Sequence, residues 1–258
     1  MFRRIGEIYR FKNLLLELII RDIKVRYKNS LLGYLWTLLY PLILMGIYIL
    51  VFSFVFRFRI ENYPIFILCG IVPWILFQKT TSRSTTSIIG GAVIIKKVYF
   101  PRELVVLTVM GTELFNFALM LIVFIPIAII YKVPLGPGML FLPLALVCQV
   151  FFMAGVSLFL ASSNVFFRDV SELYEALVRI WFYASPIIYP VSMVPERFQK
   201  FYMLNPMAVI ISIYRNAVLG YEIPGYDYLA LMAVLTLLMF IVGFWSFIKL
   251  EKMFLKLI

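Results

Sequence analysis

Few residues in this sequence could carry out enzyme chemistry, and the candidates do not cluster. The 258 residues include no histidine, which is the commonest general base and metal ligand. The two cysteines, Cys69 and Cys148, lie in separate apolar segments without metal-binding spacing, so we expect buried thiols that only pack. A phosphate-binding loop of the GxxxxGK[ST] type is absent, which excludes ATP binding by that route. The sequence therefore predicts a chain that is not an enzyme and that holds no metal or cofactor of its own.

The acidic residues suggest one position of functional interest. Glu172 and Glu175 share a helix face close to two arginines, a mixture that is typical of a salt-bridged helix start rather than of a catalytic pair. Glu113 lies well inside an apolar run, with Asn116 about one turn later. Ionisable groups at that depth in a membrane are costly and usually face a bundle interior or a wet cavity. Glu113 is therefore either a gate or pathway residue, or the structural partner of a buried arginine or amide.

The elements that must position these residues follow from the composition. The chain is 64% hydrophobic and only 14% charged, whereas soluble domains average about 45–50% apolar and about 25% charged residues. A membrane-spanning helix needs about 20 mostly apolar residues. We therefore expect an all-α integral membrane protein with six transmembrane helices. The six segments are Tyr34–Phe56, Tyr63–Gln78, Leu104–Tyr131, Met139–Ser162, Leu173–Tyr189 and Tyr228–Ile248.

The basic residues predict the orientation of these segments, because cytoplasmic loops carry an excess of Lys and Arg. Eighteen lie in the N-terminal segment, the second and fourth loops and the tail, against six in the alternate loops. Both termini are therefore expected to be cytoplasmic in a multi-pass protein. This topology explains the net charge of +11 without a nucleic-acid partner.

Residues 1–30 precede the first span and read as an amphipathic interface helix. Apolar residues recur every four positions, at Phe11, Leu15, Ile19, Ile23 and Tyr27. We expect this apolar face to lie in the acyl boundary and the basic face to meet lipid phosphates. The residues assigned to the head-group interface are Arg21, Lys24, Arg26, Tyr27 and Lys28. The alternative is an ordinary positively charged leader without a specific role.

Residues 31–258 form the predicted membrane domain, and its segment 190–226 does not fit a span. The apolar run Met207–Tyr214 has only eight residues, between Asn205–Pro206 and Arg215. A seventh span would also move the basic tail to the outside. We therefore expect short re-entrant helices on the outer face between spans five and six.

Aromatic residues make up 17% of the chain, and two roles are open to them. Many are expected to form the interfacial belts of a membrane protein. Those turned toward a bundle axis could instead stack against sugar rings. The candidate residues for a translocation path are Tyr34, Trp36, Glu113, Trp181 and Tyr183.

Three stretches together resemble a known family. They are RYKNSLLGYLWTLLYPL at residues 26–42, KKVYFPREL at residues 96–104 and WFYASPIIYPVSMVPERFQKFYMLNPMAVIISIYRNAVLG at residues 181–220. In this order and spacing they resemble the permease subunit of bacterial ABC exporters for polysaccharides, which move O-antigen, capsule or teichoic acid. The resemblance extends from about Arg10 to the end of the chain.

The resemblance implies partners and a location that composition alone does not. Two permeases would pair in the bacterial inner (plasma) membrane, each on a separate ATP-binding subunit that holds ATP–Mg. The pair would form a channel for a polyisoprenyl-diphosphate-linked polysaccharide, with O-antigen favoured over teichoic acid and capsule. The alternatives are a drug-exporting ABC permease, a secondary transporter with only Glu113 as a midplane ionisable group, or a membrane-embedded glycan-modifying or lipid-modifying enzyme.

The resemblance also implies a cytoplasmic coupling helix at residues 94–103, seated in the ATP-binding subunit. We expect Tyr99 and Phe100 to be exposed there as contact anchors ringed by charge, with Pro101 fixing the following turn. The alternative is that both aromatic rings dip into the lipid interface. The residues assigned to coupling are Lys96, Lys97, Tyr99, Phe100, Pro101, Arg102 and Glu103.

Overall fold

The computed structural model describes residues 2–28, 30–55, 57, 60–131 and 137–257, and these residues form helices and no strand. Five helical segments among them are long and apolar enough to cross a membrane. They are Leu35–Val55, Tyr63–Gly90, Glu103–Ile130, Gly138–Phe166 and Tyr226–Phe254. Phe56, at the expected end of the first span, and Arg59 and Lys132, counted in the outer loops, lie outside the described residues.

The helices in chain order have the following bounds. Those of the spanning segments are α3 (Leu35–Tyr48) with the π-helix η1 (Ile49–Val55), α4 (Tyr63–Gly90), α6 (Glu103–Ile130), α7 (Leu142–Phe166) after the 3-10 helix η2 (Pro137–Phe141), and α11 (Tyr226–Leu257). The shorter ones are α1 (Phe2–Arg10), α2 (Lys12–Tyr27), α5 (Ala92–Lys97), α8 (Val170–Tyr183), η3 (Val191–Met193), α9 (Glu196–Tyr202) and α10 (Pro206–Leu219).

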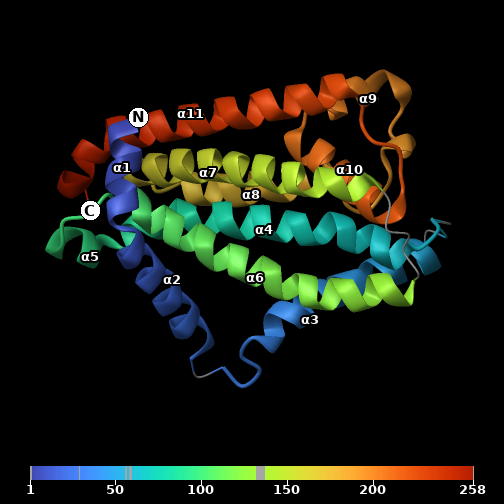
Figure 1. Ribbon diagram of the computed structural model, residues 1–258, viewed down its shortest axis with the longest axis horizontal. Coiled ribbons are helices and arrows are strands. Elements are labelled where there is room, and N and C mark those ends of the chain that lie inside the picture. Colours follow the sequence, from blue (N-terminus) through green and yellow to red (C-terminus); the bar gives the residue numbers. More distant parts are fainter. Residues whose placement is uncertain (1, 29, 56, 58–59, 132–136, 258) are drawn as a thin grey trace.

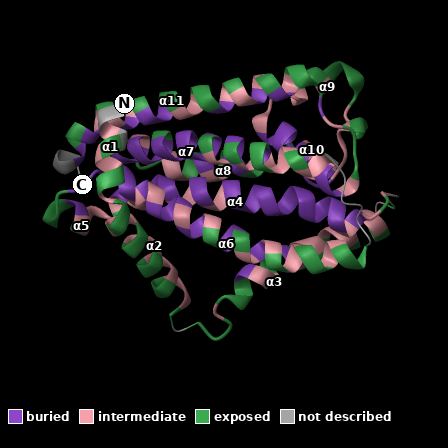
Figure 2. Cartoon of the chain, in the orientation of Figure 1, coloured by how far each residue is buried: buried purple, intermediate pink, exposed green. Residues whose placement is uncertain are grey.

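The helix α4 lies at the centre of the bundle. Most of its residues are buried in the bundle, whereas the segment Leu35–Val55, formed by α3 and η1, is almost entirely unburied, and Figure 2 shows the contrast. Asn62 adopts a left-handed conformation (φ 51°) immediately before α4, and Pro64 occupies its first turn. Gln149 of α7 donates a hydrogen bond of 2.7 Å to the carbonyl of Pro73, so a buried polar contact ties the two helices together.

The helices α7 and α11 approach each other closely at two glycines. A Cβ atom on Gly155 would collide with the backbone of Met239, and one on Gly243 would collide with the backbone of Gly155. Small residues at such crossings let helix backbones come together in membrane proteins. The pair runs along one side of the bundle (Figure 1).

The expected fifth span is shorter in the structure than in the sequence-based prediction. The helix α8 ends at Tyr183, and residues 184–190 follow in turns and bends. Pro186 explains the break, because a proline disfavours the helical conformation of the residue before it and donates no backbone hydrogen bond. Fourteen helical residues extend about 21 Å, less than the hydrocarbon core of about 30 Å. Six complete spans are therefore not confirmed.

The short elements lie at opposite ends of the bundle. Both termini and α5 lie at one end, and α9 with the start of α11 lies at the other (Figure 1). We call these the terminal end and the far end. The short helices expected in segment 190–226 are present as α9 and α10, and the Asn205 side chain accepts a hydrogen bond from the backbone N–H of Met207 to cap α10. Their placement in a membrane stays a prediction.

Candidate functional site

The helix α2 is tied to the bundle by a buried carboxylate. Glu113 on α6 is 1% exposed, and its Oε1 accepts hydrogen bonds of 2.6 Å from both Arg26 and Arg83. The amide of Asn116 donates to Glu113 Oε2 at 2.9 Å, and Tyr27 donates to Asn116 Oδ1 at 2.8 Å. Of the two interpretations open for Glu113, the structure supports the structural partner of arginine and amide groups.

These contacts correct part of the prediction for the N-terminal helix. Arg26 and Tyr27 were assigned to lipid head groups, but both side chains bond to groups of α6 because Glu113 and Asn116 need partners there. The apolar face of α2 also packs on α6, where Ile19 lies against Gly111. The side chains of Arg21, Lys24 and Lys28 are exposed, as a head-group interface requires.

A cavity of about 450 Å³ opens beside this ion-pair cluster. It is lined by Arg26, Lys79 and Arg83 together with aromatic side chains, among them Trp36 and Tyr40. Arg83 also pairs with Asp22 of α2 at 2.9 Å, and the Lys79 ammonium lies 4.6 Å from the centroid of the Tyr40 ring. We call this the basic cavity.

The charges of the basic cavity favour an anion. Three cations line it, and the carboxylates bonded to them are Glu113 and Asp22. Lys79 forms no ion pair within the described part of the chain. Burial alone would lower the pKa of the Arg26 guanidinium, but the hydrogen bond and charge of Glu113 outweigh it and raise the pKa. The cavity therefore keeps surplus positive charge beside an aromatic wall.

The predicted coupling segment has one exposed and one anchored part. The helix α5 covers only Ala92–Lys97, with residues 98–102 outside any helix. Lys96, Lys97 and Tyr99 are exposed, and Tyr99 retains 83% of its accessible surface.

The prediction that Phe100 is exposed is wrong. Its ring is 5% exposed and belongs to the main hydrophobic core, because burying an aromatic ring is strongly favourable. Pro101 and Glu103 are buried as well, so this half of the segment faces the bundle.

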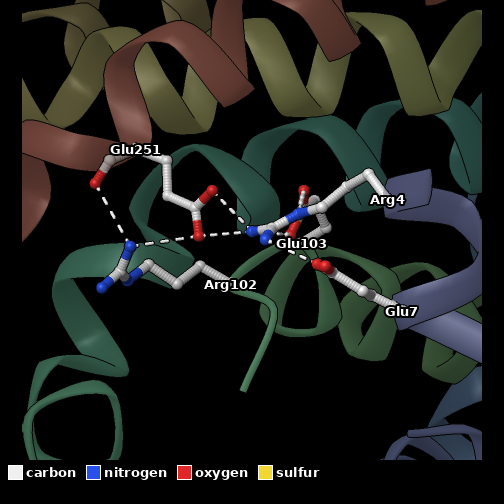
Figure 3. Close-up of polar contacts among 5 residues, drawn as sticks. All are labelled: Arg4, Glu7, Arg102, Glu103 and Glu251. Carbon is white, nitrogen blue, oxygen red and sulfur yellow. Dashed lines mark hydrogen bonds and ion pairs between the residues drawn. The ribbon is translucent and has the colours of Figure 1, made fainter. Parts of the chain in front are cut away.

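An ion-pair network fixes the anchored half of the segment at the terminal end (Figure 3). Arg4 Nε donates to Glu103 Oε1 at 2.7 Å, and Arg4 Nη2 donates to Glu251 Oε1 at 2.5 Å. Arg102 Nη1 donates to the same Glu251 oxygen at 3.0 Å, and Glu7 accepts from Arg4 at 3.1 Å. We call these five residues the terminal clasp. It joins α1, the start of α6 and the end of α11.

The electrostatics of the terminal clasp depend on two carboxylates. Burial alone would lower the pKa of the Arg4 guanidinium, but hydrogen bonds and charge from Glu103 and Glu251 outweigh it and raise the pKa above its usual range. Arg102 and Glu103, which were assigned to the ATP-binding subunit, bond within the chain instead, because the buried Glu103 carboxylate requires a cation.

The candidate path residues fall into two groups. Trp36 lines the basic cavity, where Arg26 bonds to Glu113, and the Tyr34 ring packs on Tyr27 there, whereas Trp181 and Tyr183 lie on α8. Trp181 packs at the edge of rings of α4 and α7, with centroid distances of 5.2 Å to Phe77 and 5.9 Å to Phe152. Its indole N–H donates to Asn205 at 3.0 Å, which links α8 to the cap of α10. Tyr34, Trp36 and Tyr183 keep exposed faces instead. Their distribution fits interfacial positions as well as a path.

The predictions for the cysteines and for the acidic residues of α8 can be compared with the structure. Both cysteine thiols are buried. Glu172 and Glu175 form no ion pair within the described residues, so the salt-bridged helix start was wrong, and the Asn164 side chain accepts from the Ser171 N–H there instead. No group of three or more metal-ligating side chains occurs among the described residues.

Two features of the site were not predicted. The terminal clasp depends on Arg4 and Glu251, which are 247 positions apart, and no local pattern links them. Lys79 and Arg83 were counted only as cytoplasmic charge. Their spacing of four residues on one apolar helix was the signal that could have placed them on a common face.

The long apolar helices around a buried α4 define an integral membrane protein of the helical-bundle class. Its family is shown by sequence similarity. The model of the ABC-2 type transporter family matches residues 13–219, and the chain belongs to that family.

Curated relatives cover nearly the whole chain. It is 32% identical over 242 residues to the O-antigen export system permease protein RfbA of Myxococcus xanthus, with 93% of each chain covered. It is 33% identical over 251 residues to RfbA of Klebsiella pneumoniae, with 95% of each chain covered. The polysialic acid transport protein KpsM of Escherichia coli is 23% identical over 230 residues, which cover 85% of this chain and 88% of KpsM.

Proposed function

We propose that this chain is the membrane permease subunit of an ATP-driven exporter that moves lipid-linked polysaccharide across the bacterial inner membrane. The observation that carries the proposal is its similarity, over 93–95% of its length, to proteins named as O-antigen export permeases. Identity to the polysialic acid transport protein is lower, at 23%. O-antigen is therefore the favoured cargo, ahead of capsule and teichoic acid.

The basic cavity supports a lipid-linked diphosphate as the form of the cargo. A diphosphate offers several oxygens to guanidinium and ammonium groups, and such charge-assisted hydrogen bonds are among the strongest in proteins. Arg26 and Arg83 each bond already to a carboxylate, so Lys79 contributes the uncompensated charge. The lipid tail would lie along the exposed apolar surface of the segment Leu35–Val55, few of whose residues are buried in the bundle.

The topology proposed here places both termini in the cytoplasm. The basic cavity, α5 and the exposed Arg21, Lys24 and Lys28 of α2 then lie on the cytoplasmic side, where anionic head groups attract basic residues. The helices α9 and α10 lie on the outer side as the re-entrant pair. Two copies of the permease form the channel, and the exposed apolar surface of α3 is available to lipid or to the second copy.

A separate subunit hydrolyses ATP–Mg in this proposal. Its contact surface on the permease is the exposed part of the coupling segment, namely Lys96, Lys97 and Tyr99. An exposed aromatic side chain surrounded by cationic residues is typical of an anchor in a protein interface.

The coupling surface can be tested by copurification with the ATP-binding subunit. Tyr99→Ala removes an exposed ring and should lower the affinity for the subunit by about tenfold if Tyr99 is an anchor worth about 1.4 kcal/mol. Tyr226→Ala, a similarly exposed tyrosine at the far end, is the matched control. Equal recovery of the ATP-binding subunit with both variants would show that Tyr99 is not part of the interface.

The function is tested by deletion and complementation in the native cell. Deleting the gene should abolish surface O-antigen and leave lipid-linked polymer inside the cell, and the wild-type chain should restore export. Lys79→Ala should restore export poorly, whereas Lys252→Ala, which removes an exposed lysine of the tail, should restore it fully. Normal surface polysaccharide in the deletion strain would refute the proposed function, and accumulation of a capsular polymer would reassign the cargo.

A further inference from the structure

A second cavity, of about 740 Å³, lies at the far end of the bundle. It is enclosed by the start of α4, the segment 190–203, α10 and the loop that leads into α11. Small-ligand sites usually have volumes of about 300–1,000 Å³, so the size is that of a binding site. No part of the proposed cytoplasmic function uses this cavity.

The feature of this cavity that needs explaining is a buried cation. Arg215 is 3% exposed, and no carboxylate of the described residues pairs with it. Its Nη2 donates to the carbonyl of Ile187 at 2.7 Å, and its guanidinium carbon lies 3.5 Å from the centroid of the Phe66 ring. Its Nε–H is buried without a hydrogen-bond partner. A buried donor left unsatisfied is costly, so a group that accepts from it would bind favourably.

The other lining groups select the chemistry of that acceptor. Tyr221 and Tyr228 present aromatic rings, Gln199 presents an amide, and Glu196 and Glu222 present exposed carboxylates. The two carboxylate charges balance those of Arg215 and of Lys200, the second cation of the lining, so the cavity has no surplus positive charge for an anion. The carboxylates also accept hydrogen bonds from hydroxyl groups. A ligand with hydroxyl groups that both donate and accept, and with an apolar face for an aromatic ring, satisfies all of these groups.

We propose that this far-end cavity binds a short carbohydrate segment, with Arg215 and Gln199 donating to its oxygens, Glu222 accepting from its hydroxyls and Tyr221 contacting a ring face. The inference rests on the proposed function, because it takes the exported polysaccharide as the source of the sugar. On the proposed topology the site lies at the outer surface, where the polymer leaves the permease.

The test is site-specific photocrosslinking in the native cell, with the wild-type partners present. A benzoylphenylalanine is placed at Tyr221, which lines the cavity, or at Tyr226, the first residue of α11, which lies close in sequence but is not among the lining residues. The probe is the polysaccharide that the cell makes, detected on the purified permease by periodate oxidation and hydrazide labelling. Crosslinked sugar should be roughly tenfold higher at position 221 than at position 226, as expected for a bound ring face.

Variants of the exposed lining groups separate binding from folding. Glu222→Gln should lower crosslinking at position 221 by roughly threefold or more, because it weakens a charge-assisted hydrogen bond. Asp227→Asn, an exposed carboxylate outside the cavity, should leave it unchanged. Both variants must be recovered from the membrane in wild-type amounts, and recovery is measured on the same gel.

The outcomes separate the two proposals. Equal crosslinking at positions 221 and 226, in a cell whose export depends on this chain, overturns the carbohydrate site and leaves the function intact. Crosslinking at position 221 to a protein, including a second copy of the permease, also overturns the site. Export that persists without the chain overturns the proposed function and the site with it.

Discussion

Arg4 of α1 and Arg26 of α2 are matched with carboxylates, whereas Arg215 at the far end is buried with no carboxylate partner among the described residues. Arg4 bonds to Glu103 and Glu251, and Arg26 shares Glu113 with a second arginine. Within the described part of the chain, Arg215 contacts main-chain carbonyls and an aromatic face instead. Paired charges fix helices in one arrangement, because breaking a buried pair leaves an uncompensated charge. The comparison indicates a terminal end fixed by ion pairs and a far end that keeps binding capacity.

Glu113→Gln should produce the largest loss of stability. It leaves Arg26 and Arg83 without the carboxylate that both contact, and breaking a buried pair costs about 3–5 kcal/mol. Both arginines keep some solvent exposure, so we expect about 3 kcal/mol, measured as the denaturant dependence of the purified permease in lipid nanodiscs. Glu172→Gln, on an exposed carboxylate, should cost less than about 0.5 kcal/mol. Equal stability of the two variants would contradict the role of Glu113.

Arg4→Ala should have the next largest effect and should act locally. Removing it breaks the hydrogen bonds to Glu103 and Glu251 and should cost about 2 kcal/mol. Hydrogen exchange of residues 98–104 should rise, since the clasp holds this segment to α11. Arg10→Ala, an exposed arginine of the same helix, is the control. Unchanged exchange in the Arg4 variant would show that the clasp does not hold the coupling segment.

Arg215→Met sharpens the comparison, because it removes a buried cation and retains much of its volume. Replacing a buried charge by an apolar side chain is often nearly neutral, and here two carbonyls lose a donor, so we expect about 1 kcal/mol. Thermal unfolding of Arg215→Met and Arg4→Ala in the same nanodiscs ranks the two ends directly. A larger loss of stability for Arg215→Met than for Arg4→Ala would contradict the conclusion that ion pairs fix the terminal end more firmly than the far end.

The smallest expected effect is that of salt concentration on stability, and it should differ between the two ends. Raising the salt concentration from about 0.05 M to about 0.5 M screens partly exposed ion pairs but not contacts to carbonyls and rings. The stability difference between wild type and Arg4→Ala should shrink by about 0.5 kcal/mol, while that between wild type and Arg215→Met stays constant. Chemical denaturation at both salt concentrations measures each stability difference. An equal decrease of the two differences would contradict the conclusion that ion pairs stabilise the terminal end and that neutral contacts hold Arg215.

The sequence predicted the features that depend on local pattern. Apolar length placed the five long helices, and the short apolar run after Asn205–Pro206 indicated a short helix that the structure has as α10. Depth within an apolar run singled out Glu113, but left a gate or pathway role and a structural role both open. These predictions depend only on hydrophobic length within one segment.

The features that failed depend on contacts between distant segments. A periodic pattern could show that α2 is amphipathic, but not whether α6 or lipid covers its apolar face. Tyr99 and Phe100 are adjacent aromatic residues, and only tertiary packing distinguishes the exposed first ring from the buried second ring. The break after Tyr183 depends on Pro186. A single proline changes the hydropathy of a whole segment too little to show where a helix ends.

The glycine contact between α7 and α11 has a mechanical consequence for the terminal clasp. Gly243 lies eight positions before Glu251 on the same helix, a distance of about 12 Å along the axis. Gly243 packs against the backbone of Gly155, so the position of this part of α11 sets where Glu251 meets Arg4 and Arg102. A methyl group added at Gly243 would therefore displace this part of α11, and a mutation buried within the bundle would be felt at the coupling segment.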